Sequence, residues 1–170
     1  YIYLREEFPE AALIVEKAIE EARAHHFVGK NVLGSGFDVE IYVHRGAGAY
    51  ICGEESALIS SCEGLRGDPR NRPPFPAQRG YLGMPTSVNN VETLCCVPRI
   101  LEKGSAWFAS IGSHKSTGTK LLSVSGDCTR RGVYEVALGT RLAEVLEMCG
   151  AEDPLAVQVG GPSGQMVGPS

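Results

Sequence analysis

Residues 64–87 constrain the fold of this chain more than any other segment, because they cannot form a helix or a strand. They hold five prolines and four glycines, and proline both fixes φ and removes a backbone donor. Long connections without regular structure are mostly functional or disordered. Phe75 lies between two prolines, with four arginines around it: Arg66, Arg70, Arg72 and Arg79. Such a loop can cover a planar, phosphate-bearing ligand, whereas composition alone favours a solvated loop anchored by Phe75.

The segment before this loop predicts an α/β arrangement. Residues 1–5 are typical of a short buried strand, and residues 9–27 form an amphipathic helical pattern that begins at Pro9, a favoured first helical residue. Apolar and polar residues then alternate over 37–44, which predicts a strand with one buried face. A strand, a helix and a strand in this order indicate a parallel βαβ unit, and hence part of a Rossmann-like sheet.

A glycine turn, Gly46-Ala47-Gly48, follows the second predicted strand, and a helix is expected to begin near Glu54. Turns of this kind bind ligands in α/β sheets because backbone N–H groups are left open. The adjacent carboxylates Glu54 and Glu55 suit a helix start but would repel a pyrophosphate. Two interpretations stay open: the carboxylates only cap the helix, or they contact uncharged donors such as ring N–H, ribose hydroxyl or carboxamide groups.

After the loop, Asn89 and Asn90 offer both donors and acceptors, as the edge of a heterocycle requires, and they are equally common N-cap residues. A helix is predicted over 91–104. The last fifty residues predict a small α+β module of β-grasp (ubiquitin-like) type, with strands over 121–126, 132–136 and 156–159 and a helix over 141–149 that Thr140 would cap. The predicted domains are residues 1–110, a linker over 111–117, and an incomplete β-grasp domain over 118–170.

Composition excludes several classes of protein. The net charge of −4 disfavours nucleic-acid binding through a basic face, and no apolar run approaches the ~20 residues of a membrane span. The six cysteines include no CxxC pair, so we expect no metal site and interpret them as reduced, small buried hydrophobes. The opening Tyr-Ile-Tyr-Leu is typical of the middle of a protein, and we expect an internal fragment of a longer chain.

Residues 46–93, GAGAYICGEESALISSCEGLRGDPRNRPPFPAQRGYLGMPTSVNNVET, resemble the flavin-binding core of the NADH-binding flavoprotein subunit of respiratory complex I. They resemble more strongly the diaphorase subunit of NAD-reducing hydrogenases. The stretches Gly-Val-Tyr-Glu-Val at 132–136 and Thr-Arg-Leu-Ala-Glu-Val-Leu at 140–146 are similar to that family's soluble-ligand-binding β-grasp (SLBB) domain. The resemblance therefore covers essentially the whole chain.

This resemblance implies FMN at the carboxyl edge of the sheet and NADH stacked on it as the hydride donor. The FMN contacts that it implies are Tyr50, Gly53, Glu54, Asn89, Asn90 and Thr93. Glu55 would line the nicotinamide side as the catalytic residue, Phe75 would stack near the adenine, and Arg72 would lie beside the dinucleotide. Family members often carry Lys at the position of Arg72, which keeps the charge but not the geometry.

The resemblance also implies parts that this sequence lacks, namely the upstream glycine-rich phosphate loop and the cysteines that hold a 4Fe–4S cluster. The expected partners are iron–sulfur electron-transfer subunits of a larger complex, in the cytoplasm or on the cytoplasmic or matrix face of a membrane complex, without direct membrane insertion. The alternative is a binding or scaffold module that associates with a partner subunit or a small ligand without catalysis.

Overall fold

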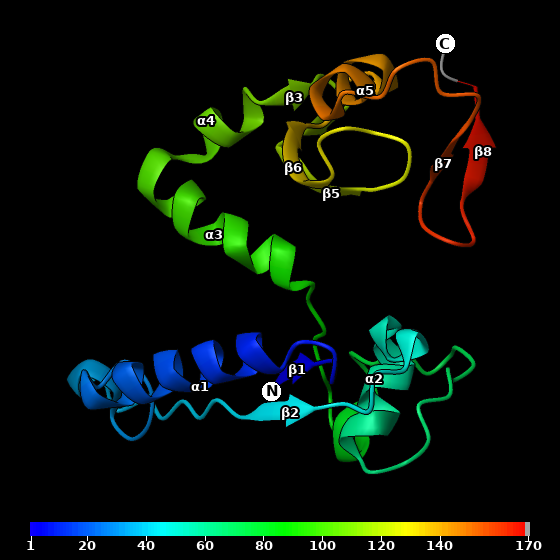
Figure 1. The fold of residues 1–170 in the computed structure, drawn as a ribbon. Coiled ribbons are helices and arrows are strands. Elements are labelled where there is room, and N and C mark those ends of the chain that lie inside the picture. Colours follow the sequence, from blue (N-terminus) through cyan, green and yellow to red (C-terminus); the bar gives the residue numbers. More distant parts are fainter. Residues whose placement is uncertain (169–170) are drawn as a thin grey trace. The chain divides into compact units, whose positions relative to one another are not determined.

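The computed structural model describes residues 1–168, which form a mixed α/β chain of short sheets and helices (Figure 1). The chain divides into two compact units, Tyr1–Val88 and Asn89–Ser170. The division precedes the predicted linker over 111–117, which instead contains a short antiparallel pair, β3 (Gly112–Ser113) and β4 (Ser116–Thr117). The domain boundaries of the complete protein stay a prediction.

The first unit contains the predicted strand–helix–strand arrangement. Strand β1 (Ile2–Leu4) pairs in parallel with β2 (Val43–Arg45), and α1 (Pro9–Ala24) connects them with Pro9 in its first turn. Figure 1 shows α1 lying alongside β2, and Arg45 Nη2 forms an ion pair with Glu16 Oε1 of α1 at 2.8 Å. The larger Rossmann-like sheet is not formed by these two strands alone.

The strand predicted over 37–44 is wrong for most of its length, because the chain before Val43 folds back toward the end of α1. Val39 forms an isolated antiparallel bridge with Gly29. Asp38 accepts from Lys30 Nζ at 2.7 Å and from the Asn31 amide at 2.9 Å. Alternation of apolar and polar residues is shared by strands and by extended loops, and here Phe37 is 67% exposed. A short 3₁₀ turn, η1 (Val32–Gly34), lies between the two bridged residues Gly29 and Val39.

The chain enters the candidate site directly after β2. Gly46 is buried beside Tyr3, and a Cβ at this position would overlap the phenol ring. A 3₁₀ turn, η2 (Tyr50–Gly53), then leads into α2 (Glu55–Cys62), which starts where the sequence predicted. The buried apolar residues of this unit are Ala12, Ile19, Val28, Cys52, Ala57 and Ile59. Within this unit, α1 packs against β2, and α2 packs against η2.

The second unit begins with α3 (Val91–Lys103), which ends before Gly104 as predicted, and α4 (Ser105–Ala109). Strands β5 (Thr119–Val124) and β6 (Gly132–Ala137) form an antiparallel pair, followed by α5 (Leu142–Cys149). Thr140 does not cap α5, because its hydroxyl donates to the Ala137 carbonyl at 2.7 Å and Arg141 occupies the N-cap position. Val136, Val145 and Cys149 are buried.

The third strand predicted for the β-grasp module exists but pairs elsewhere. Strand β7 (Val157–Val159) forms an antiparallel pair with β8 (Gln165–Val167), and neither strand joins β5 and β6. A single β-grasp sheet is therefore not present among the described residues, and the β-grasp assignment stays a prediction. No helix within residues 1–168 combines the length and apolar character that crossing a membrane requires.

Candidate functional site

Glu54 closes the glycine turn and caps α2. Its Oε2 accepts from the Ser56 amide at 3.0 Å, the Ala57 amide at 2.9 Å and the Ser56 hydroxyl at 2.5 Å. The Ser56 hydroxyl is the largest influence that holds the pKa of Glu54 below its usual value, and it outweighs the opposing effect of burial. Glu54 therefore caps the helix, and its contact with a ligand stays a prediction.

Arg72 joins this capped carboxylate to its neighbour. The Nη2 atom of Arg72 donates to Glu54 Oε1 at 2.6 Å and lies 2.6 Å from Glu55 Oε1. The guanidinium carbon also lies 6.0 Å from the centre of the Phe75 ring, within the range of a cation–π contact. The structure thus brings together four predicted site residues: Glu54, Glu55, Arg72 and Phe75.

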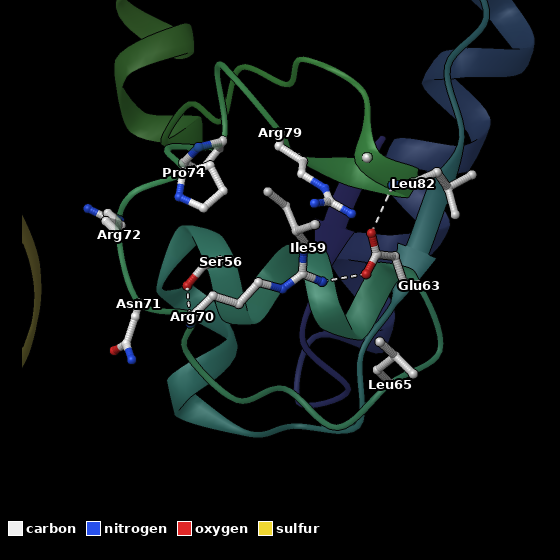
Figure 2. A pocket seen from close by; sticks show the side chains of 13 residues that line it. Ser56, Ile59, Glu63, Leu65, Arg70, Asn71, Arg72, Pro74, Arg79 and Leu82 are labelled. Atoms are coloured by element: carbon white, nitrogen blue, oxygen red, sulfur yellow. Dashed lines mark hydrogen bonds and ion pairs between the residues drawn. The ribbon is translucent and has the colours of Figure 1, made fainter.

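A pocket of about 520 Å³ lies between α2 and the loop over 64–87 (Figure 2). Its walls come from α2, from the arginine- and proline-rich part of the loop, and from the 3₁₀ turn η3 (Tyr81–Gly83), the one helical turn in this loop. Figure 2 shows Arg79 extending from the loop into the space between Ile59 and Leu82. The pocket therefore has both cationic and apolar lining.

One carboxylate ties both ends of this loop to α2. Glu63 forms an ion pair with Arg70, near the beginning of the loop, and its Oε1 accepts from the Leu82 amide at 2.8 Å, near the end (Figure 2). Arg70 further donates from Nε to Ser60 Oγ at 3.0 Å, and its amide donates to Ser56 Oγ at 2.8 Å. These contacts explain how a loop without strands or long helices keeps a defined path.

Ser56 and Glu63 were not among the predicted site residues, and Arg70 was predicted only as one of four arginines near Phe75. A polar serine in the first turn of a helix and a carboxylate just before a proline-rich loop are common surface features. The sequence around Ser56 and Glu63 therefore does not predict that these side chains bind the two ends of the loop. The contacts become visible only once the loop has closed over α2.

The remaining predicted residues lie at two places. Tyr50 and Gly53 belong to η2, immediately before Glu54, and Tyr50 is 77% exposed. Asn89, Asn90 and Thr93 lie in the second unit at the start of α3. The Asn90 side chain accepts from the Glu92 amide at 2.8 Å and caps α3. Both Glu54 and Asn90 therefore perform the structural role that competed with ligand contact in the sequence.

The prediction that the cysteines are buried holds for two of the six, and three others are partly buried: Cys62, Cys96 and Cys128. Cys52 and Cys149 are buried, whereas Cys95 is exposed on α3. Within residues 1–168, no group of three or more His, Cys, Asp and Glu side chains is arranged to hold a metal ion.

The sequence profile of the Nuo51 FMN-binding domain matches residues 1–99, and the chain belongs to this family of flavin-binding domains. Among curated relatives, it is 54% identical over 167 residues to the NAD-reducing hydrogenase HoxS subunit alpha of Cupriavidus necator, covering 98% of this chain and 28% of the relative. It is 56% identical over 146 residues to an NADH-quinone oxidoreductase subunit of Aquifex aeolicus, covering 86% of this chain and 34% of the relative.

A solved structure is similar along nearly the whole chain. The crystal structure of an NAD+-reducing NiFe-hydrogenase in the H2-reduced state matches with a TM-score of 0.87 and 43% identity, covering 99% of this chain and 28% of that chain. The chain thus spans about a third or less of the length of the relatives named here. The resemblance found in the glycine-turn and loop motifs is confirmed at the level of the family.

Proposed function

We propose that these 170 residues are part of a longer flavoprotein subunit that oxidises NADH by hydride transfer to FMN. The observation that carries the proposal is the carboxylate pair Glu54 and Glu55 at the end of a glycine turn, bridged by Arg72, in a chain of the Nuo51 FMN-binding domain family. FMN supplies the redox chemistry when bound, and the protein supplies binding, orientation and electrostatics.

The residues around the turn fit a flat, uncharged ring system. Tyr50 exposes its aromatic side chain, and a Cβ at Gly53 would meet no atom within 4 Å, so ring and backbone are open to a ligand. One guanidinium against two carboxylates leaves one net negative charge at the start of α2. That charge disfavours a phosphate and favours the nicotinamide ring, on which positive charge develops as hydride leaves.

The individual roles follow the sequence prediction. Tyr50, Gly53 and Glu54 contact FMN from the turn, with Asn89, Asn90 and Thr93 contributing from the start of α3. Glu55 faces the nicotinamide, and Arg72 and Phe75 hold the rest of the dinucleotide. Because Glu54 Oε2 is occupied by the cap, only its Oε1 edge is left for a flavin, in competition with Arg72.

The complete subunit is proposed to place these residues in a Rossmann-like domain followed by an SLBB β-grasp domain. It would carry its 4Fe–4S cluster on residues outside this chain and pass electrons to iron–sulfur partner subunits in the cytoplasm or at the face of a membrane complex. Both curated relatives bear the names of subunits, which supports an assembly. The same motifs serve hydrogenase and quinone-reducing complexes, so the electron acceptor is left open.

The second candidate is a scaffold module without catalysis, which the capping roles of Glu54 and Asn90 favour. Absorbance of the purified full-length subunit near flavin wavelengths distinguishes the two. A subunit that purifies without flavin and does not take up added FMN would support the scaffold.

Glu55→Gln in the full-length enzyme tests the NADH role. We expect slower NADH oxidation or altered NADH affinity with FMN still bound, because the change removes a charge without changing shape. Gly53→Ala is the matched variant for the flavin side: the structure has room for the methyl group, so we expect normal folding and reduced FMN content. Loss of flavin in Glu55→Gln with unchanged kinetics would reverse the roles of Glu54 and Glu55.

A further inference from the structure

Glu54 and Glu55 are adjacent in sequence but are held in very different ways. Glu54 is fixed by three hydrogen bonds to Oε2 from the first turn of its own helix. Glu55 has one partner among the described residues, Arg72. With a side chain 34% exposed, Glu55 would otherwise sample several rotamers, since ordering a long side chain costs conformational entropy.

Arg72 can order Glu55 because Arg72 is itself anchored. Its Nη2 donates to Glu54 Oε1, the oxygen that the helix cap leaves free, and its guanidinium lies over the Phe75 ring. The contacts form a series: the helix start fixes Glu54, Glu54 fixes Arg72, and Arg72 fixes Glu55. The Nη2 atom of Arg72 thus contacts both carboxylates, although Arg72 lies 18 positions after Glu54 in the sequence.

We propose that Arg72 is a positioning residue for Glu55, and that its main effect on NADH oxidation passes through this carboxylate rather than through a direct contact with the dinucleotide. The inference rests on the proposed function. It changes the role of Arg72 from a dinucleotide ligand to the residue that determines where the carboxylate beside the nicotinamide points. Phe75 then contributes by holding the guanidinium as well as by stacking.

A double-mutant cycle in the full-length, flavin-loaded subunit tests this inference. Arg72→Gln, Glu55→Gln and the double variant are compared with the wild type for flavin content, kcat and KM for NADH. We expect Arg72→Gln to lower kcat/KM on the order of tenfold, the scale for loss of a charged hydrogen bond. It should reproduce the division between kcat and KM that Glu55→Gln produces, and the double variant should be no worse than the more affected single variant.

The control is Arg141→Gln, which removes an exposed arginine outside the proposed site whose ion pair is with Glu144; we expect wild-type kinetics. Additive losses in the double variant, or an Arg72→Gln effect divided between kcat and KM differently from that of Glu55→Gln, would overturn the inference and return Arg72 to a direct dinucleotide contact. A wild-type subunit that binds no flavin, or whose flavin NADH does not reduce, would instead overturn the proposed function.

Discussion

Glu54 shows how much local structure can depend on one carboxyl group. Its Oε2 accepts from two amides of the first helical turn, for which α2 itself offers no backbone carbonyl. Its Oε1 accepts from Arg72 of the loop over 64–87. The Ser56 hydroxyl and the two amides keep its pKa below the usual value. The folded state therefore binds this proton less tightly than the unfolded state does, and the ionised form stabilises the helix start.

At the residue scale, we predict that Glu54→Ala in the full-length subunit loosens the start of α2. Loss of an N-cap costs about 1 kcal/mol, so hydrogen exchange of the Ser56 and Ala57 amides should quicken roughly fivefold after correction for intrinsic rates. In the wild type this protection should be complete above the usual pKa of 4.5 and decline as pH falls through the lower folded value. Glu10→Ala, in the first turn of α1 where no side chain caps, is the control and should leave these amides unchanged.

At the scale of elements, the loop over 64–87 owes its path to α2 rather than to its own sequence. Proline and glycine exclude helix and strand but do not select one conformation. Selection comes from Glu63, which binds Arg70 at one end and the Leu82 amide at the other. Burial raises the pKa of Glu63, but the Leu82 amide and Arg70 together hold that pKa below its usual value.

We predict that Glu63→Ala frees this loop while α2 stays folded. Limited trypsin digestion of the full-length subunit should cleave after Arg66, Arg70 and Arg79 on the order of tenfold faster, because loss of a charged hydrogen bond at each end makes local opening easier. Glu63→Gln keeps an acceptor for Leu82 and should give an intermediate rate. The control is Glu144→Ala, which removes an exposed ion pair with Arg141 on α5. Equal cleavage of all variants would show that the contacts of Glu63 do not hold the loop.

At the scale of the whole molecule, the described residues 1–168 contain few long-range strand pairings. The parallel pair β1 and β2 has three residues in each strand, and isolated two-stranded sheets are marginally stable in water. Large apolar side chains such as Leu101 and Leu155 are exposed, as is typical of surfaces that contact further chain or a partner.

We predict that the isolated 170-residue chain binds FMN weakly or not at all, shows no NADH oxidation and tends to self-associate. Each neutral hydrogen bond contributes about 0.5–1.5 kcal/mol net, and the contacts proposed from Tyr50, Gly53 and Asn89 are too few for tight binding without a phosphate site. Titration of FMN into the purified chain, followed by flavin fluorescence, measures this directly. A micromolar or tighter complex would show that the contacts within this chain suffice.

Features that depend on a few neighbouring residues could be predicted from the order of the amino acids. Pro9 starts α1, and α3 ends before Gly104, which has a positive φ of 88°. The prolines of 64–87 exclude strands and long helices. The family could also be predicted, because the glycine turn, the proline-rich loop and the paired asparagines occur in a specific order along one continuous stretch.

Which groups these elements bring together depends on how the chain folds as a whole. Alternation over 37–44 predicted a strand, but pairing requires a second strand in register, and most of that segment folds back beside Gly29 instead. Strand β7 likewise pairs with the strand that lies in register beside it, which is β8. Glu54 and Glu55 are adjacent and of the same type, yet Glu54 caps the helix, whereas the Glu55 carboxylate has Arg72 as its one partner within residues 1–168. Local propensity cannot predict such differences, because they depend on where a closed loop places a side chain.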